Sequence, residues 1–366
     1  TVTPLWEARW PNISEYTLPG LRNGMAIAQS GTMATAIVDS NLTRADGFWN
    51  NATVWVRGGD GYEGKTTTVS SFIASSDTLN LNPIPNNPSY LEPKAGNNYY
   101  LSGVLGALDA ANEWYVDSAA GKVYLWAPNG GVPTNVEVKQ RPRAFELSNK
   151  SYIYITGIQT FAADIQMNNS NNNVLDGITA QYLYSSNLNQ GSSRYDRGIN
   201  IVGNNNEIKN STIAYSTGTL IMIAGNNNRV VNNNIHDGDY MGSYAALIIL
   251  QSGSQNLISR NTLRDAGRSN IQWKDAGGSA VIEYNNIYNG MWLTTDGGML
   301  YAYGTDLRNS EIRYNLIHDN KAYSSGFNLY FDNFTENVVA HHNVIYNSGT
   351  NGRGIQINTP GNFKLI

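Results

Sequence analysis

The sequence predicts an all-β protein whose C-terminal part is a parallel β-helix with three short strands per rung. From about position 150 onward the chain repeats at intervals of roughly 22 to 30 residues, which is the spacing of solenoid proteins. Each repeat holds three short apolar segments, and no segment shows the periodicity of a long amphipathic helix. A β-propeller or β-sandwich is the alternative, but both pair their strands antiparallel, and a propeller blade needs four strands.

Residues 1–145 form a separate, less regular N-terminal region in this interpretation. Val54–Val56 and Val69–Leu81 are expected to be strands. Trp114–Asp117 and Lys122–Trp126 alternate apolar and polar residues around a four-residue loop that ends in glycine, a pattern typical of a hairpin. We expect this β-rich region to cap one end of the solenoid, because open ends expose unpaired strand edges.

Residues 146–366 form the predicted β-helix, and every repeat has the same three landmarks. The first segment contains Ile208, Val230, Leu257, Ile282, Ile312 or Val338, and the second contains Ile213, Ile235, Leu263, Ile287, Ile317 or Ile345. An asparagine near each second segment is expected to bond along the stack of turns, at Asn210, Asn234, Asn261, Asn285, Asn315 and Asn343. The third strands are expected at residues 220–223, 247–250, 270–273, 299–302, 328–331 and 354–357.

The end of the sequence resembles the start of another rung, and the chain stops within it at Ile366. An uncapped rung would expose apolar side chains and a free strand edge. We therefore expect that the natural protein continues beyond Ile366, or that a second polypeptide completes the solenoid.

Composition excludes several classes of function. The chain has 366 residues, with 24 Lys and Arg against 28 Asp and Glu, and only 14% of its residues are charged. The absence of a basic run argues against a nucleic-acid partner, and the absence of a long apolar segment argues against a membrane span. No cysteine is present, which excludes disulfides and thiol catalysis. Secretion is expected from the first residue, Thr1, and from sequons at Asn12, Asn41, Asn51, Asn149, Asn168, Asn210 and Asn333.

Three segments resemble motifs of a known group of proteins. These are Asn112–Trp126, Asp296–Gly304 and Asn328–Asn333. The repeat block resembles the right-handed parallel β-helix proteins of the pectate-lyase-like superfamily, and the three segments are similar to parts of its β-helical glycoside hydrolases. The resemblance implies a right-handed solenoid and carbohydrate chemistry.

The alternation of residues along each strand predicts which side chains point away from the core of the solenoid. If Ile271, Trp273 and Leu329 point inward, the outward columns carry an amphipathic strip that suits sugar rings and hydroxyl groups. A solvated outer face is the alternative, but it has little use for three tyrosines on adjacent rungs. The substrate-binding candidates on this strip and beside it are Gln251, Gln272, Lys274, Tyr301, Tyr303, Tyr330 and Arg268, and those in the neighbouring loops include Asp239, Tyr244 and Trp292.

Carboxylates at the edges of this strip are candidate catalytic groups. Neighbouring rungs lie about 4.8 Å apart, so acids on nearby rungs reach separations that suit either retaining or inverting glycosidases. The resemblance favours Asp296 and Asp332 as the pair, one acting as general acid and the other as base or nucleophile, with Asp275 in reserve. Turn capping is the alternative role for each of them.

The sequence therefore predicts a secreted glycoside hydrolase with a carbohydrate substrate, no cofactor and no metal. The four histidines occupy turn positions and match no metal-binding spacing. One alternative is a polysaccharide lyase in which Lys274 is the base and Arg268 helps to neutralise a uronate. The other is a carbohydrate-binding solenoid without catalysis.

Overall fold

The computed structural model describes residues 4–185, 198–358 and 363–365, which form two compact units. The first lies within Thr1–Val138 and the second starts at Lys139. Among the described residues, no helix combines the length and apolar character that crossing a membrane requires.

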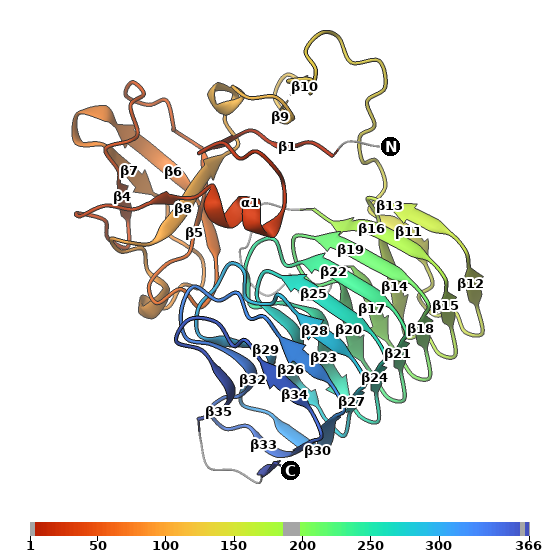
Figure 1. The fold of residues 1–366 in the computed structure, drawn as a ribbon. Helices are drawn as coiled ribbons and strands as arrows, with labels where there is room; N and C mark the ends of the chain where they lie inside the picture. Colours follow the sequence, from red (N-terminus) through yellow and green to blue (C-terminus); the bar gives the residue numbers. More distant parts are fainter. Residues whose placement is uncertain (1–3, 186–197, 359–362, 366) are drawn as a thin grey trace. The chain divides into compact units, whose positions relative to one another are not determined.

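The first unit is built from two small sheets and short helical segments (Figure 1). One sheet has the order β2-β8-β5-β6-β7-β4 with β3 also paired to β8, and the other has the order β1-β9-β10. The strands are β1 Trp6–Glu7, β2 Arg9–Trp10, β3 Ala26–Ile27, β4 Ala36–Val38, β5 Thr53–Val56, β6 Lys65–Ile73, β7 Thr78–Leu81, β8 Asn98–Ser102, β9 Glu113–Asp117 and β10 Lys122–Leu125. The helical segments are α1 Leu18–Asn23, η1 Ala74–Ser76, η2 Ser89–Leu91 and η3 Leu105–Ala107.

The predicted hairpin is confirmed, because β9 and β10 pair antiparallel with Asp117 opposite Lys122. The segment predicted as one strand, Val69–Leu81, is instead the second half of β6, the turn η1 and β7. Asp77 ends that turn in the left-handed region, with φ of 51°, which allows the chain to fold back antiparallel.

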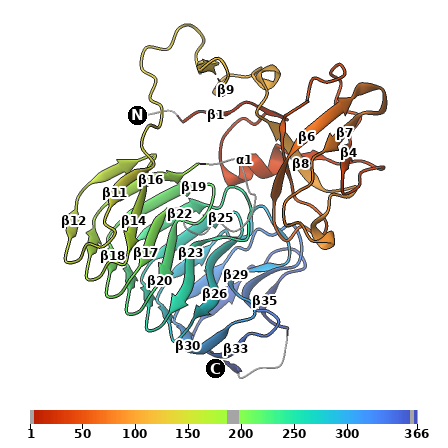
Figure 2. The same cartoon turned by 180° about the vertical axis from the view of Figure 1, so that it is seen from behind.

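The second unit contains three parallel sheets that the chain visits in turn, once per rung (Figures 1 and 2). Within the described residues, sheet 1 comprises β11 Arg143–Glu146, β14 Asp164–Asn168, β17 Ile199–Val202, β20 Ile221–Ala224, β23 Ala246–Gly253, β26 Ser269–Gly277, β29 Gly297–Ala302, β32 Gly326–Phe331 and β35 Arg353–Ile357. Sheet 2 comprises β12 Tyr154–Thr156, β15 Val174–Asp176, β18 Glu207–Lys209, β21 Arg229–Val231, β24 Leu257–Ser259, β27 Val281–Glu283, β30 Asp306–Arg313, β33 Glu336–His341 and β36 Phe363–Leu365. Sheet 3 comprises β13 Gln159–Phe161, β16 Thr179–Tyr184, β19 Thr212–Ser216, β22 Asn234–Gly238, β25 Thr262–Ala266, β28 Asn286–Tyr288, β31 Leu316–His318 and β34 Val344–Tyr346.

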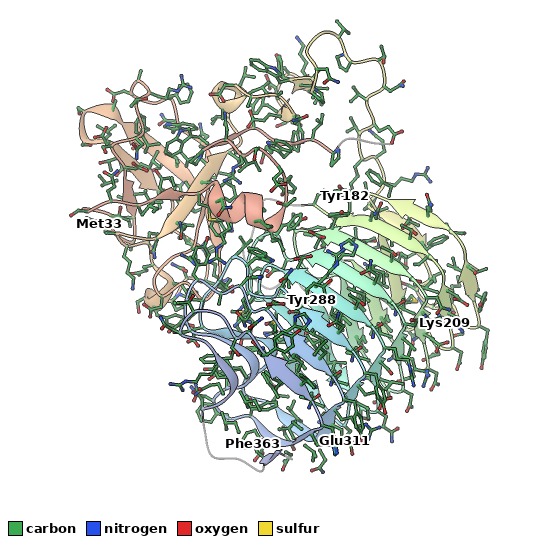
Figure 3. The ribbon with its side chains drawn as sticks, in the orientation of Figure 1. Met33, Tyr182, Lys209, Tyr288, Glu311 and Phe363 are labelled. Atoms are coloured by element: carbon green, nitrogen blue, oxygen red, sulfur yellow. The ribbon has the colours of Figure 1, made fainter. Side chains whose placement is uncertain are left out.

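The core of this unit is a column of aliphatic side chains, because alternate residues of each short strand point inward. Ile282, Ile287 and Ile271 are fully buried and come from the three different sheets. Their neighbours Glu311 and Tyr288, labelled in Figure 3, lie on sheets 2 and 3 beside buried isoleucines and remain partly exposed. The predicted parallel β-helix with three strands per rung is therefore confirmed.

A ladder of buried amides runs along the turn between sheets 2 and 3. Asn285 donates from Nδ2 to Oδ1 of Asn315 over 2.9 Å, and its own Oδ1 accepts from the backbone N–H of Asn261. Asn233 and Ser211 continue the same ladder on earlier rungs. These bonds satisfy backbone groups that a tight buried turn would otherwise leave unpaired.

The sequence-based register of this ladder is wrong on two rungs. Asn210 was expected in the ladder but precedes it, with φ of 53° in the exposed turn, and Ser211 takes the buried position. Asn234 was expected as well but begins β22, and the ladder residue is Asn233. In a run of consecutive asparagines only the backbone conformation decides which amide points inward.

Candidate active site

The candidate site lies on the outward face of sheet 1, where successive rungs bring side chains into register. Gln272 of β26, Tyr301 of β29 and Tyr330 of β32 are paired across the sheet. They lie outside the main aliphatic core, as the alternation predicts. The expectation of a solvent-accessible strip is nevertheless wrong for these three side chains, which are only 0%, 4% and 3% exposed.

Part of this burial comes from the loop between β22 and β23. Tyr244 of that loop packs edge-to-face on Tyr301, with ring centroids 5.9 Å apart. Asp239 at the start of the loop is fully buried, and its Oδ1 accepts from the backbone N–H and the hydroxyl of Ser243. These bonds hold the loop in a fixed turn. Asp239 therefore has a visible structural role in shaping the loop that carries Tyr244.

Two cations converge on Tyr244. The guanidinium carbon of Arg268 lies 4.2 Å from the ring centre of Tyr244 and 4.5 Å from that of Tyr301. The ammonium nitrogen of Lys274 lies 4.0 Å from the ring centre of Tyr244. Arg268 is 1% exposed, whereas Lys274 and the ring of Tyr244 are partly exposed, so Lys274 is the one of the two cations that reaches solvent. The interactions are of the cation–π type, which is strongest where water is excluded.

Asp332 follows β32 directly and is held by several donors. Its Oδ2 accepts from the hydroxyl of Tyr301 over 2.7 Å. Its Oδ1 accepts from Nδ2 of Asn358 over 2.8 Å and from the backbone N–H of Asn333 over 2.7 Å. Asn358 also donates to the hydroxyl of Tyr330. Donors from several rungs therefore fix the orientation of this partly exposed carboxylate.

Asp296 precedes β29 in the left-handed region, with φ of 42°, and is partly exposed. Asp332 follows Phe331, which pairs with Ala302 at the far end of β29. The two acids thus lie at opposite ends of the paired strands β29 and β32, a difference that the rung spacing considered from the sequence leaves out.

The long side chain of Tyr330 connects the two acids electrostatically. Burial raises the pKa of Tyr330 well above its ordinary value of 10.0, and the negative charges of Asp296 and Asp332 raise this pKa further. Asp332 also hydrogen-bonds the Tyr330 hydroxyl, whereas Asp296 acts on it through its charge.

The two glycines after Asp296 are required by packing around this cluster. A Cβ on Gly297 would lie 2.7 Å from Cε of Met291 and 3.3 Å from Nη2 of Arg268, and a Cβ on Gly298 would lie 2.8 Å from Cβ of Tyr330. The Asp296–Gly304 motif thus supplies an acid followed by space for Arg268 and Tyr330.

The remaining candidates lie beside this cluster. Asp275 is exposed and accepts a hydrogen bond from Nε2 of Gln251. Tyr303 is 49% exposed and packs against Phe334. Trp292 is partly exposed, and its indole N–H donates to Asp265.

Gln272 has an unusual environment for an amide. Among the described residues, neither its Nε2 nor its Oε1 has a hydrogen-bond partner, although both atoms are buried. A buried amide without partners is costly, so this position favours an additional polar group.

The roles of two residues in the candidate site were not predicted from the sequence. Tyr244 was grouped only with general loop residues, and its role as the ring between Arg268, Lys274 and Tyr301 depends on a loop conformation that has no periodicity. Asn358 was not connected with Asp332. The available signal was its place two residues after Gln356, on the outward alternation of the last third strand.

No metal centre is visible in the part of the chain that the structure describes. In those residues, no group of three or more His, Asp or Glu side chains is placed to hold an ion.

Comparisons with known proteins agree with this architecture. Residues 165–333 match the family model described as "Right handed beta helix region". None of the curated proteins compared with the chain matches it. A solved structure described as a glycoside hydrolase is similar at 12% identity and a TM-score of 0.68, over 99% of this chain and 75% of that one.

Two further solved structures show weaker similarity. Pectate lyase Pel9A has 16% identity and a TM-score of 0.35, over 63% of this chain and 64% of that one. The tailspike protein gp49 from Pseudomonas phage LKA1 has 10% identity and a TM-score of 0.29, over 93% of this chain and 45% of that one. From the family model, the glycoside hydrolase structure and the three stacked sheets, we conclude that the second unit folds as a right-handed parallel β-helix.

Proposed function

We propose that the protein is a glycoside hydrolase that cleaves glycosidic bonds of a polysaccharide or oligosaccharide, with Asp296 and Asp332 as its catalytic pair. The observation that carries the proposal is the carboxylate of Asp332, which Tyr301, Asn333 and Asn358 hold beside the outward face of sheet 1, with Asp296 at the start of the neighbouring strand β29. Glycosidases of either stereochemistry need two carboxyl groups that flank the scissile bond. The similarity of the whole fold to a glycoside hydrolase supports the same class.

The hydrogen bonds favour different roles for the two acids. The carboxylate oxygens of Asp332 accept all the hydrogen bonds described above for this residue, an arrangement that suits a base or nucleophile. We assign the general acid role to Asp296, which precedes β29 and is partly exposed. In this scheme the general acid protonates the leaving oxygen of the glycosidic bond, while Asp332 attacks the sugar or activates water.

The surrounding side chains supply contacts that suit a sugar. Lys274, Tyr303 and Trp292 are exposed or partly exposed beside the cluster and offer an ammonium donor and two aromatic rings. Gln272, whose amide has no hydrogen-bond partner among the described residues, is fully buried and is not one of these contacts. Ammonium donors and aromatic faces match the hydroxyl groups and the C–H faces of a sugar ring.

A glycan panel with chromatographic detection of products tests this proposal. The wild-type protein is incubated with neutral and acidic polysaccharides and oligosaccharides, alongside the Asp332→Asn variant. We expect new reducing ends from at least one glycan with the wild type and none with the variant. Equal product formation by both proteins would remove Asp332 from the mechanism.

A polysaccharide lyase is the second candidate, and one observation favours it. Arg268 and Lys274 place two positive charges at the ring of Tyr244, beside the tyrosines that surround Asp332. β-Elimination needs positive charge near a uronate carboxylate and a base for the α proton. A lyase yields an unsaturated product that absorbs ultraviolet light, whereas a hydrolase does not, so the same panel separates the two reactions. Binding to a glycan without any product would indicate a non-catalytic solenoid.

A further inference from the structure

Two tyrosine hydroxyls form a directed line of hydrogen bonds that ends at Asp332. The hydroxyl of Tyr244 donates to the hydroxyl of Tyr301 over 3.2 Å, and that of Tyr301 donates to Oδ2 of Asp332 over 2.7 Å. A hydroxyl has one proton and can accept further bonds. Because Tyr301 gives its proton to the carboxylate, the bond from Tyr244 can only run toward Tyr301. The line therefore stabilises negative charge on Asp332.

Tyr301 is held rigidly by its surroundings. Its ring is 4% exposed and packs edge-to-face against Tyr244 and Tyr330, with centroid distances of 5.9 and 5.4 Å. Arg268 lies 4.5 Å from its ring centre. Burial raises the pKa of Tyr301 far above its ordinary value of 10.0, so the hydroxyl keeps its proton throughout the range in which enzymes work.

The two oxygens of Asp332 accept from different donors. Oδ1 accepts from Asn333 and Asn358, and Oδ2 accepts from Tyr301. The hydroxyl of Tyr330 also hydrogen-bonds this carboxylate. The contact that Tyr301 makes is thus to a different oxygen from the one that the two asparagines contact.

We propose that Tyr301 is a positioning residue for Asp332, whose carboxylate it orients through its hydroxyl group, with Tyr244 as the next link behind it. The effect of this role on catalysis rests on the proposed function, whereas the line of hydrogen bonds can be tested without any substrate. The other ionisable groups around this line are Asp296, Tyr330, Arg268 and Lys274. The proposal requires that all four keep their places when the Tyr301 hydroxyl is removed.

Tyr301→Phe removes the hydroxyl and retains the ring that packs against Arg268 and Tyr330. The side-chain carboxyl carbon of Asp332 is observed by NMR at neutral pH in protein labelled at aspartate carboxyls, with the signal assigned by its loss in Asp332→Asn. We expect this signal to shift in Tyr301→Phe, because the carboxylate loses its 2.7 Å hydrogen bond. Tyr244→Phe is expected to give a smaller shift in the same direction. Tyr314→Phe, on the exposed turn between sheets 2 and 3, is the matched control without a shift.

Kinetics with the substrate found in the glycan panel complete the test. We expect Tyr301→Phe to lower kcat about tenfold with KM changed less than about twofold. An unshifted Asp332 carboxyl signal in Tyr301→Phe overturns the positioning role, whatever the activity. If Tyr301→Phe does not fold, an unshifted signal in Tyr244→Phe overturns it instead. Full activity in Asp332→Asn overturns the proposed function alone and leaves the NMR result to decide the hydrogen-bond line.

Discussion

The hydroxyl of Tyr301 lies 2.7 Å from Oδ2 of Asp332, although the two residues are 31 positions apart in the chain. They come from consecutive rungs of the β-helix, and Tyr301 pairs with Tyr330, two residues before Asp332. Parallel stacking brings such distant positions side by side at about 4.8 Å. The candidate site is therefore a property of the stack, and no single repeat contains it.

Asp296→Asn is expected to lower kcat by about 10²- to 10⁴-fold, because general acid catalysis contributes on this scale and an amide cannot donate the required proton. Steady-state kinetics on the glycan identified by the panel measure the effect. Asp176→Asn, on the distant strand β15, is the matched control and should keep wild-type kinetics. Unchanged turnover in Asp296→Asn would assign turn formation as the role of this residue and leave Asp275 as the next acid to test.

Arg268→Ala is expected to destabilise the protein by about 2–4 kcal/mol, since it removes a fully buried side chain with contacts to the rings of Tyr244 and Tyr301. Lys274→Ala removes a partly exposed cation from the same ring and should cost less than about 1 kcal/mol. Urea denaturation measures both free energies of unfolding. Equal values for the two variants would contradict a structural role for the buried guanidinium.

Asn285→Ala is expected to cost about 3 kcal/mol, because it leaves the backbone N–H of Asn261 and the carbonyl of Ile258 without their partner inside the buried turn. Asn226→Ala removes comparable side-chain bonds from an exposed turn, to Asn204 and Ser254, where water can replace them. We expect this control to cost less than about 1 kcal/mol. Chemical denaturation of both variants checks whether the burial of an asparagine, rather than the number of its hydrogen bonds, determines its contribution to the free energy of unfolding.

Asp319→Asn is expected to lower stability near neutral pH and to have no effect in strong acid. The hydrogen bond from His318, followed by that from Asn347, holds the pKa of Asp319 below its ordinary value of 3.8. A depressed carboxyl pKa stabilises the folded state above the unfolded value and loses this contribution as the pH falls through the folded value. The effect at neutral pH should stay under about 1 kcal/mol, because the pair is near the surface.

The Asp319 prediction is checked by melting temperatures of both proteins from pH 7 down to pH 2. The two curves should converge below about pH 3. Asparagine tolerates the left-handed conformation of this position, with φ of 57°, so backbone strain adds little to the comparison. A difference in melting temperature that stays constant with pH would show that the lost contact does not depend on ionisation.

The site was only partly predictable from the sequence. Strand alternation correctly places Tyr301 and Tyr330 away from the aliphatic core, because that pattern depends only on the two-residue period of a strand. Their burial depends on contacts such as the loop that carries Tyr244, and a loop has no period from which its conformation could be read. The offset between Asp296 and Asp332 depends on which end of its strand each acid occupies, as well as on the spacing of the rungs.

The amino-acid sequence by itself determined the parallel stack, since apolar residues recurring once per rung can be buried together only in that way. It also determined the residue types on the outward columns. The tertiary structure alone decided which amide of an asparagine run turns inward, which tyrosines are covered, and which donors reach Asp332. Those outcomes depend on contacts between rungs and loops, and such contacts exist only after the chain has folded.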